Sequence, residues 1–212
     1  MRPPPRAASG LGTASLVLGG LMLLVQLYVI TLDAPSEAVF FRHFALNPGL
    51  VRAALAGEAP LVPALWPFLT SLFLHDGWMH LFSNLAFLAI FGTVVERHLG
   101  APRLLFLFFA CGLFGGVLQV AIPDDFGPPA ELVVGASGGL FGLMGAALTC
   151  GAPQTRPGAP QRSLLLALIV INAGIGLVAA SGVMGGLLLI GWQAHLGGFL
   201  SGLFLGRRLH CG

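Results

Sequence analysis

Long apolar runs alternate with short polar stretches along this 212-residue chain. Most runs have the roughly 17–25 residues that a helix needs to cross the hydrocarbon core of a bilayer. The pattern predicts membrane spans at about residues 13–32, 78–99, 103–122, 162–181 and 186–209, with a shorter fourth span at 137–151. We therefore expect an all-α membrane protein, built as a bundle of six transmembrane helices.

The polar stretches suggest how the spans are connected. Residues 1–12 are rich in proline and arginine and are expected to form a disordered tail ahead of one domain, 13–209. Residues 33–76 form a long first loop outside the cytoplasm, in which short interfacial helices are expected at Ala38–Phe44 and Pro48–Leu55. The first apolar run is too long for a signal peptide, so we interpret it as a retained helix.

Composition supports a membrane location. The chain is 56% apolar and only 8% charged, whereas about a quarter of the residues in soluble domains are charged. Its three cysteines, Cys111, Cys150 and Cys211, have no motif spacing, so we expect neither a disulfide framework nor a metal site. We also expect no cofactor and no nucleic-acid partner, and we expect contact with membrane lipids.

The ten arginines are distributed unevenly, and the chain has no lysine. With six spans, eight arginines and one acid, Glu96, fall on the side of the two termini, and Arg42, Arg52 and seven acids fall on the other. Because positive residues stay inside, we expect both termini to be cytoplasmic. The tail is too short and proline-rich for a mitochondrial transit helix, so we expect a multi-pass protein of a bacterial inner (plasma) membrane.

A few polar residues lie within the apolar runs, where they are costly and mark candidate functional sites. Ser137 stands between glycines at the start of the short run, His80 and Asn84 share one helix face, and His195 lies in the last run. Counted from the arginine-marked cytoplasmic ends at about 1.5 Å per residue, all four residues fall in one layer, roughly 18–25 Å above those ends and toward the outer side. The simpler alternatives are a helix-capping serine and packing histidines.

Glycine spacing predicts which runs pack together. Small residues at helical spacing let helix backbones approach closely in lipid, and two runs carry such stripes: Gly138, Gly142 and Gly145, and Gly198, Gly202 and Gly206. We expect these two helices to pack and to bring Ser137 within hydrogen-bond reach of His195. Generic glycine-mediated packing would explain the stripes, but not the equal depth of serine and histidine.

Such a pair predicts serine hydrolase chemistry. A serine hydroxyl becomes a nucleophile when a positioned base removes its proton, and His195 would be that base and then the acid that protonates the leaving amine. The two runs contain no acid, so this is a dyad. His80, Asn84 and the Ser137 backbone N–H are the candidate oxyanion donors. The chain has no H-E-x-x-H pattern and no pair of aspartates within the spans.

These residues together resemble the rhomboid family of intramembrane serine proteases. The resemblance covers about residues 13–208 and rests on Gly135-x-Ser137-Gly138, His75-x-x-x-x-His80-x-x-x-Asn84 and Ala194-His195-Leu196-Gly197-Gly198. It implies a Ser137 nucleophile, a His195 base, an oxyanion hole of His80, Asn84 and the Ser137 amide, and a structural role for His75. It also implies cleavage in or beside the transmembrane helix of a single-pass substrate.

Two positions depart from the family pattern. Trp66-Pro67 stands where many members have Trp-Arg in the first loop, and Phe141 stands where many carry a tyrosine that packs on the histidine. Two other functions stay open at this stage. One is a catalytically silent relative that binds transmembrane helices, and the other is a small transporter with His80 and His195 as a proton relay.

Overall fold

A computed structural model describes residues 11–122, 132–150 and 191–210. Within these residues all regular elements are helical, and one isolated antiparallel β-bridge joins Leu46 to Val133. The predicted span at 162–181 and most of the loop at 123–134 lie outside the described residues. The elements are α1 (Thr13–Val29), α2 (Ala34–Phe44), α3 (Pro48–Leu55), α4 (Leu61–Leu65), α5 (Pro67–Thr70), η1 (Ser71–Phe73), α6 (Gly77–Phe87), η2 (Leu88–Gly92), α7 (Thr93–Leu99), α8 (Ala101–Ala121), α9 (Ser137–Cys150) and α11 (Trp192–His210).

The helices follow the predicted spans closely where both are described. The second expected span is one helix from Gly77 to Leu99, made of α6 and α7 joined without a gap by the π-helical turn η2. It and Ala101–Ala121 are the two helices of the described residues that are long and apolar enough to cross a membrane. Helix α1 ends at Val29, three residues before the expected end, and α11 begins at Trp192.

The first loop contains more helix than the sequence suggested. Helix α2 begins at Ala34, four residues earlier than expected, because the Asp33 side chain accepts a hydrogen bond from the Ser36 N–H and caps the helix. Asn47 caps α3 in the same way through the Leu50 N–H. The short helices α4, α5 and η1 were not anticipated, because segments of three to five residues carry too little apolar periodicity to be recognised.

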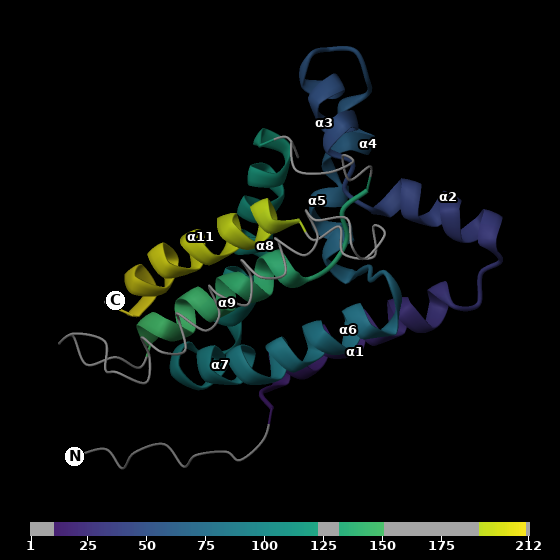
Figure 1. The fold of residues 1–212 in the computed structure, drawn as a ribbon. Helices are drawn as coiled ribbons and strands as arrows, with labels where there is room; N and C mark the ends of the chain where they lie inside the picture. The colour runs from purple at the N-terminus through teal and green to yellow at the C-terminus, as the bar shows by residue number, and fades with distance from the viewer. Residues whose placement is uncertain (1–10, 123–131, 151–190, 211–212) are drawn as a thin grey trace, which may run out of the picture.

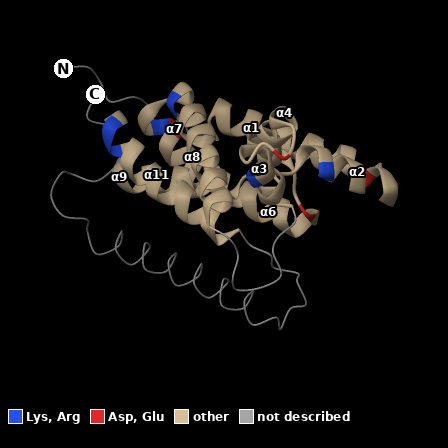
Figure 2. Cartoon of the chain, turned by 90° about the horizontal axis from the view of Figure 1, so that it is seen from above, with Lys and Arg blue, Asp and Glu red and all other residues tan. Residues whose placement is uncertain are grey.

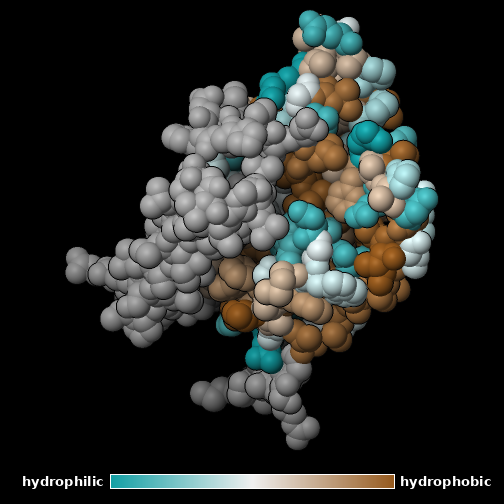
Figure 3. All heavy atoms as spheres, turned by 45° about the vertical axis from the view of Figure 1, so that its right-hand side comes forward, coloured by the Kyte–Doolittle hydropathy of each residue, from teal (hydrophilic) through white to brown (hydrophobic). Residues whose placement is uncertain are grey.

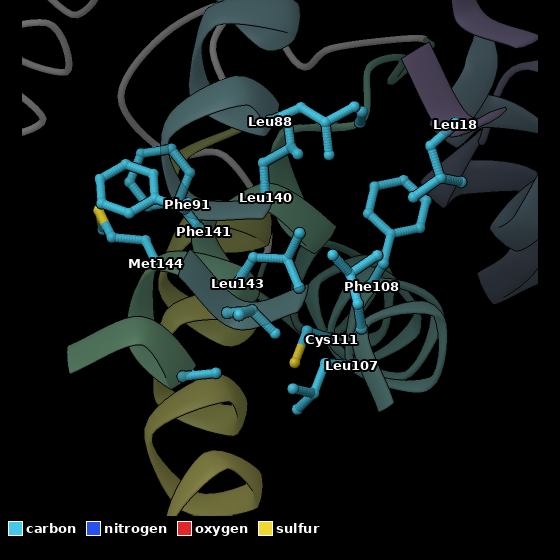
Figure 4. Close-up of a cluster of buried hydrophobic side chains, with 14 of the residues drawn as sticks. Leu18, Leu88, Phe91, Leu107, Phe108, Cys111, Leu140, Phe141, Leu143 and Met144 are labelled. Atoms are coloured by element: carbon cyan, nitrogen blue, oxygen red, sulfur yellow. The ribbon is translucent and has the colours of Figure 1, made fainter. Parts of the chain in front are cut away.

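Helix α9 lies at the centre of the described bundle, with α8 and α11 packed along it (Figure 1). Its residues from Gly138 to Ala146 are all buried, as expected for a helix that is apolar all round. Figure 4 shows Leu140 and Leu143 of α9 among Leu88 from η2 and Phe108 from α8. The central helix is therefore held by apolar contacts with several neighbours.

The outer surface of the described part is apolar over wide areas (Figure 3). Exposed large apolar side chains include Leu24 of α1, Val39 of α2, Met79 of α6 and Phe204 of α11. Charged side chains are few, and most of them lie toward the two ends (Figure 2). Arginines mark the α7–α8 turn and the end of α11, while the acids Asp33 and Glu37 lie at α2.

Candidate active site

Helices α9 and α11 approach each other through their glycines. A Cβ atom added at Gly198 or Gly202 would overlap the backbone carbonyl of Gly138 or Gly142, and one added at Gly145 would lie 2.5 Å from the Phe199 oxygen. The stripes predicted from the sequence thus form the contact, although the side chains of Cys111 and Thr149 also fill space beside Gly142 and Gly206. The two backbones are close enough for short side chains to meet across them.

Ser137 is the first residue of α9, and the non-helical segment 132–136 leads into it. The Gly135 N–H donates to the Ser71 carbonyl at 2.9 Å, and Leu46 and Val133 exchange backbone hydrogen bonds. Gly135 has φ +114°, and an added Cβ would lie 2.6 Å from His80 Nε2. A glycine is required here for both backbone conformation and space, so the loop fixes where Ser137 enters the bundle.

His195 lies in the first turn of α11 and meets Ser137. The distance between His195 Nε2 and Ser137 Oγ is 2.8 Å, and the two residues are 58 positions apart in the chain. The imidazole ring is stacked on Phe141 of α9, with ring centroids 4.2 Å apart and an interplanar angle of 11°. With its proton on Nδ1, the neutral ring accepts the serine proton at Nε2.

His80 lies beside this pair. The Asp76 backbone N–H donates to His80 Nδ1 at 3.4 Å, which assigns the ring proton to Nε2. Nε2 is the atom nearest to a Cβ added at Gly135. The ring of the fully buried His75 packs edge-on against that of His80, with centroids 5.1 Å apart. His75 therefore contacts a neighbour of the serine and not the serine itself.

Asn84 is buried one turn below His80, and its Nδ2 donates to the His80 carbonyl at 2.8 Å. Its described hydrogen bond thus runs along α6 and not toward Ser137. Gly138 faces the Ala194 oxygen across the interface, 3.5 Å from an added Cβ. The structure brings Ser137, His195, His80 and Phe141 together, and it places Asn84 at the edge of the group.

The described residues contain no group of three or more histidine, cysteine, aspartate or glutamate side chains that could hold a metal ion. The side chains that do converge are a hydroxyl and two imidazoles. Such a set has the groups that nucleophilic attack with general base assistance requires.

Comparison with known proteins agrees with this geometry. A family model described as Rhomboid domain matches residues 63–211. The chain belongs to the rhomboid family. It is thus an integral membrane protein with an all-α fold, and the resemblance drawn from the sequence is confirmed.

The rhomboid relatives come from several kingdoms. RHOMBOID-like protein 5 of Arabidopsis thaliana is 33% identical over 153 residues, covering 66% of this chain and 43% of that protein. Rhomboid-like protease 5 of Toxoplasma gondii is 30% identical over 174 residues, covering 82% of this chain and 19% of that protein. Rhomboid protease GluP of Bacillus subtilis is 31% identical over 140 residues, covering 66% of this chain and 25% of that protein. The chain spans less than half the length of these relatives.

The first departure from the rhomboid pattern, Trp66-Pro67, has a clear structural setting. The Trp66 Nε1–H donates to the His43 carbonyl at 2.9 Å, and its ring stacks on Phe44 with centroids 6.0 Å apart. Pro67 is buried and begins α5. The tryptophan thus helps to tie α2 to α5, as does the Thr70 hydroxyl of α5, which donates to the Phe44 carbonyl at 2.7 Å. Arg52 of α3 adds a bond to the Val120 carbonyl of α8 at 3.0 Å.

One strong polar contact was not predicted from the sequence. The Glu96 carboxylate of α7 accepts hydrogen bonds from the Ala14 and Ser15 N–H groups and from the Ser15 hydroxyl, at 2.8–3.0 Å. It thereby caps α1 from a neighbouring helix. The available signal was that Glu96 is the single acid on the arginine-rich side.

Proposed function

We propose that this rhomboid is an intramembrane serine endopeptidase that uses a Ser137–His195 dyad. Its substrates would be single-pass membrane proteins, cut in or beside their transmembrane helices. The observation that carries the proposal is the 2.8 Å contact between Ser137 Oγ and His195 Nε2. A capping serine would bond to backbone N–H groups of its own helix, whereas this hydroxyl meets an imidazole from another helix.

The reaction follows from the dyad. His195 Nε2 takes the hydroxyl proton as Ser137 Oγ attacks the scissile carbonyl carbon, which gives a tetrahedral oxyanion. His195 then donates that proton to the leaving amine, and an acyl-enzyme remains on Ser137. Attack by water, with His195 again as base, releases the new carboxylate and restores the serine.

The oxyanion would be stabilised by three donors. The Ser137 N–H belongs to the first turn of α9, whose N–H groups have no partner within the helix. The His80 Nε2–H is directed toward the same loop because Nδ1 is engaged by Asp76. The Asn84 amide bonds to the His80 carbonyl through one N–H and would supply the oxyanion donor in one of two ways. Either its second N–H points to the oxyanion, or the amide turns away from the carbonyl when substrate binds.

We further propose the complete architecture expected of the chain. It has six transmembrane helices, a long first loop on the outer side and a short fourth helix, α9, whose serine end lies below the membrane surface. The arginine-rich end faces the cytoplasm with both termini. The relatives come from plant, parasite and bacterium, so the choice of a bacterial plasma membrane rests on the sequence argument alone.

The test is cleavage by the purified protein in detergent or vesicles. We expect a fluorophosphonate probe to label Ser137 and a single-pass model substrate to be cut, and Ser137→Ala to abolish both. Ser201→Ala is the matched control, because that hydroxyl donates to the Gly197 and Gly198 carbonyls of its own helix and, within the described residues, makes no hydrogen bond to the dyad. Cleavage that survives Ser137→Ala would disprove the mechanism, and a folded wild type that neither reacts nor cuts would indicate a silent relative.

A further inference from the structure

Gln193 lies two residues before His195, in the first turn of α11, and its side chain is fully buried. The first backbone hydrogen bond of this turn runs from the His195 N–H to the Gly191 carbonyl at 3.2 Å. The N–H groups before it have no partner within the helix, so a first turn frays more readily than a helix interior. A base placed there needs support from outside its own helix.

The Gln193 side chain supplies such support. Its Nε2 donates to the Ile122 carbonyl at 3.2 Å. Ile122 is the C-terminal cap of α8. Carbonyl groups at a helix end receive no hydrogen bond from an N–H of their own helix. The bond gives the buried Nε2 an acceptor and the helix-end carbonyl a donor, which matters because buried polar groups left unpaired are costly.

The same turn is also held from the side. The Ala194 carbonyl oxygen would lie 2.6 Å from a Cβ atom added at Gly115 of α8. Residues 193 and 195 are about 200° apart around the helix, so Gln193 points away from the dyad. Any effect of Gln193 on Ser137 must therefore pass through the position of α11.

We infer that Gln193 is a positioning residue, which fixes the rotation of the first turn of α11 and thereby holds His195 Nε2 against Ser137 Oγ. A ring nitrogen about 7 Å from the helix axis moves by about 1.2 Å when the helix turns by about 10°. A shift of that size breaks the 2.8 Å contact, and misplacement by about 1 Å can cost a hundredfold in rate.

The inference rests on the proposed protease function, and variants of Gln193 test it. Gln193→Met keeps the length of the side chain and removes the donor, and Gln193→Asn keeps the amide but withdraws it by one methylene. We expect kcat and the fluorophosphonate labelling rate to fall roughly 10- to 100-fold in Gln193→Met, with a smaller loss in Gln193→Asn. KM should change less than threefold, because Gln193 points away from the dyad and is expected to act only through the position of His195.

Arg52→Met is the matched control. It frees a carbonyl at the same end of α8, that of Val120, but it removes no contact of α11. We expect it to keep the wild-type kcat while its thermal stability falls as much as that of the Gln193 variants. If Gln193→Met does not fold, Gln193→Asn decides the question.

Three results would overturn the inference: an unchanged kcat in folded Gln193 variants, a raised KM with kcat unchanged, or an equal loss of kcat in Arg52→Met. A wild-type protein that neither reacts nor cuts would instead refute the protease function. The two failures are therefore distinguishable.

Discussion

At the scale of residues, two contacts set the direction of the His195 ring. One is the hydrogen bond to Ser137 and the other is the stack on Phe141, at 4.2 Å and 11°. No acidic side chain of the described residues contacts the ring, so orientation depends on packing more than in a three-membered catalytic triad. Phe141 supplies that packing without the hydroxyl that many family members carry.

Replacing Phe141 should therefore change catalysis without destroying the site. Phe141→Leu removes the stack, which is worth about 0.5–1.5 kcal/mol for an aromatic pair, and we expect kcat to fall roughly three- to tenfold. Phe141→Tyr keeps the ring and should stay within about twofold of wild type. Steady-state cleavage of a single-pass substrate measures the kcat of both variants. Equal kcat values for Phe141→Leu and the wild type would show that the stack is not needed.

The dyad residues should behave as a unit. We expect Ser137→Ala and His195→Ala each to lower kcat by roughly 10⁴-fold or more, and the double variant to be no worse than either one. Additive losses in a double-mutant comparison would mean that the two side chains act independently. The measurement is single-turnover cleavage at equal amounts of folded protein.

At the scale of elements, the contact between α9 and α11 decides whether the site exists. The carbonyls of Gly138 and Gly142 occupy the space that side chains at Gly198 and Gly202 would fill. An added methyl group must therefore push α11 outward. Since His195 lies one turn from Gly198, the same movement separates the dyad.

Gly198→Ala should lower both stability and activity. We expect a loss of about 1–3 kcal/mol in the free energy of unfolding, as for other overpacked sites, together with a large loss of kcat. Gly20→Ala is the control, because Gly20 is also a helical glycine and an added Cβ there meets nothing within 4 Å. Thermal unfolding in detergent and the cleavage rate together separate the two, and a fully active Gly198→Ala would contradict the close contact.

The second element-scale link is the cap of α1 by Glu96. A carboxylate that accepts from N–H groups at a helix start is favoured by hydrogen bonds and by the helix dipole. We expect Glu96→Ala to lower the free energy of unfolding by about 1.5–3 kcal/mol, and Ser15→Ala to lower it less, since the backbone bonds remain. If the two losses add fully in a double-mutant cycle, the Ser15–Glu96 bond contributes nothing.

At the scale of the whole molecule, most of the described arginines lie at the end of the bundle formed by α7 and the end of α11, and most of the described acids lie at the other end (Figure 2). The exposed Arg97, His98, Arg207 and Arg208 lie at one end, whereas Asp33, Glu37 and Glu58 belong to the segment 33–76 at the other. The positive-inside rule predicts that the arginine-rich end faces the cytoplasm. This orientation would place the serine end of α9 on the outer side.

Cysteine labelling tests the orientation. In a variant without the three native cysteines, Glu58→Cys should react with a membrane-impermeant maleimide in intact bacterial cells that produce the protein. His98→Cys should react only after the cells are permeabilised. Both positions are exposed, so burial does not confuse the result, and the reverse pattern would invert the topology.

Much of the fold could be predicted from the sequence, and so could which candidate residues lie near one another. Apolar run length located α1, the Gly77–Leu99 helix, α8 and α9 to within a few residues, because the thickness of a bilayer fixes how long a span must be. Polar residues within those runs are few, which is why Ser137, His80, Asn84 and His195 were found. The roles assigned to them stay predictions until cleavage is measured.

The links between elements could not be predicted. The Glu96 cap of α1 and the Gln193 bond to α8 each join groups with no sequence pattern to connect them. Such contacts depend on helix rotation and on the last ångström of packing. Neither is encoded in the spacing of apolar positions along a single segment.

The sequence by itself therefore determined that this chain is a membrane protein with a serine and two histidines at a common depth, because length, hydropathy and arginine placement act locally along the chain. Only the tertiary structure decided that Ser137 meets His195 at 2.8 Å while Asn84 bonds along its own helix. The physical reason is that the depth of a residue along a span follows from counting residues. The direction in which its side chain points depends on how closely the glycines let α9 and α11 approach and on how neighbouring helices fix their rotation.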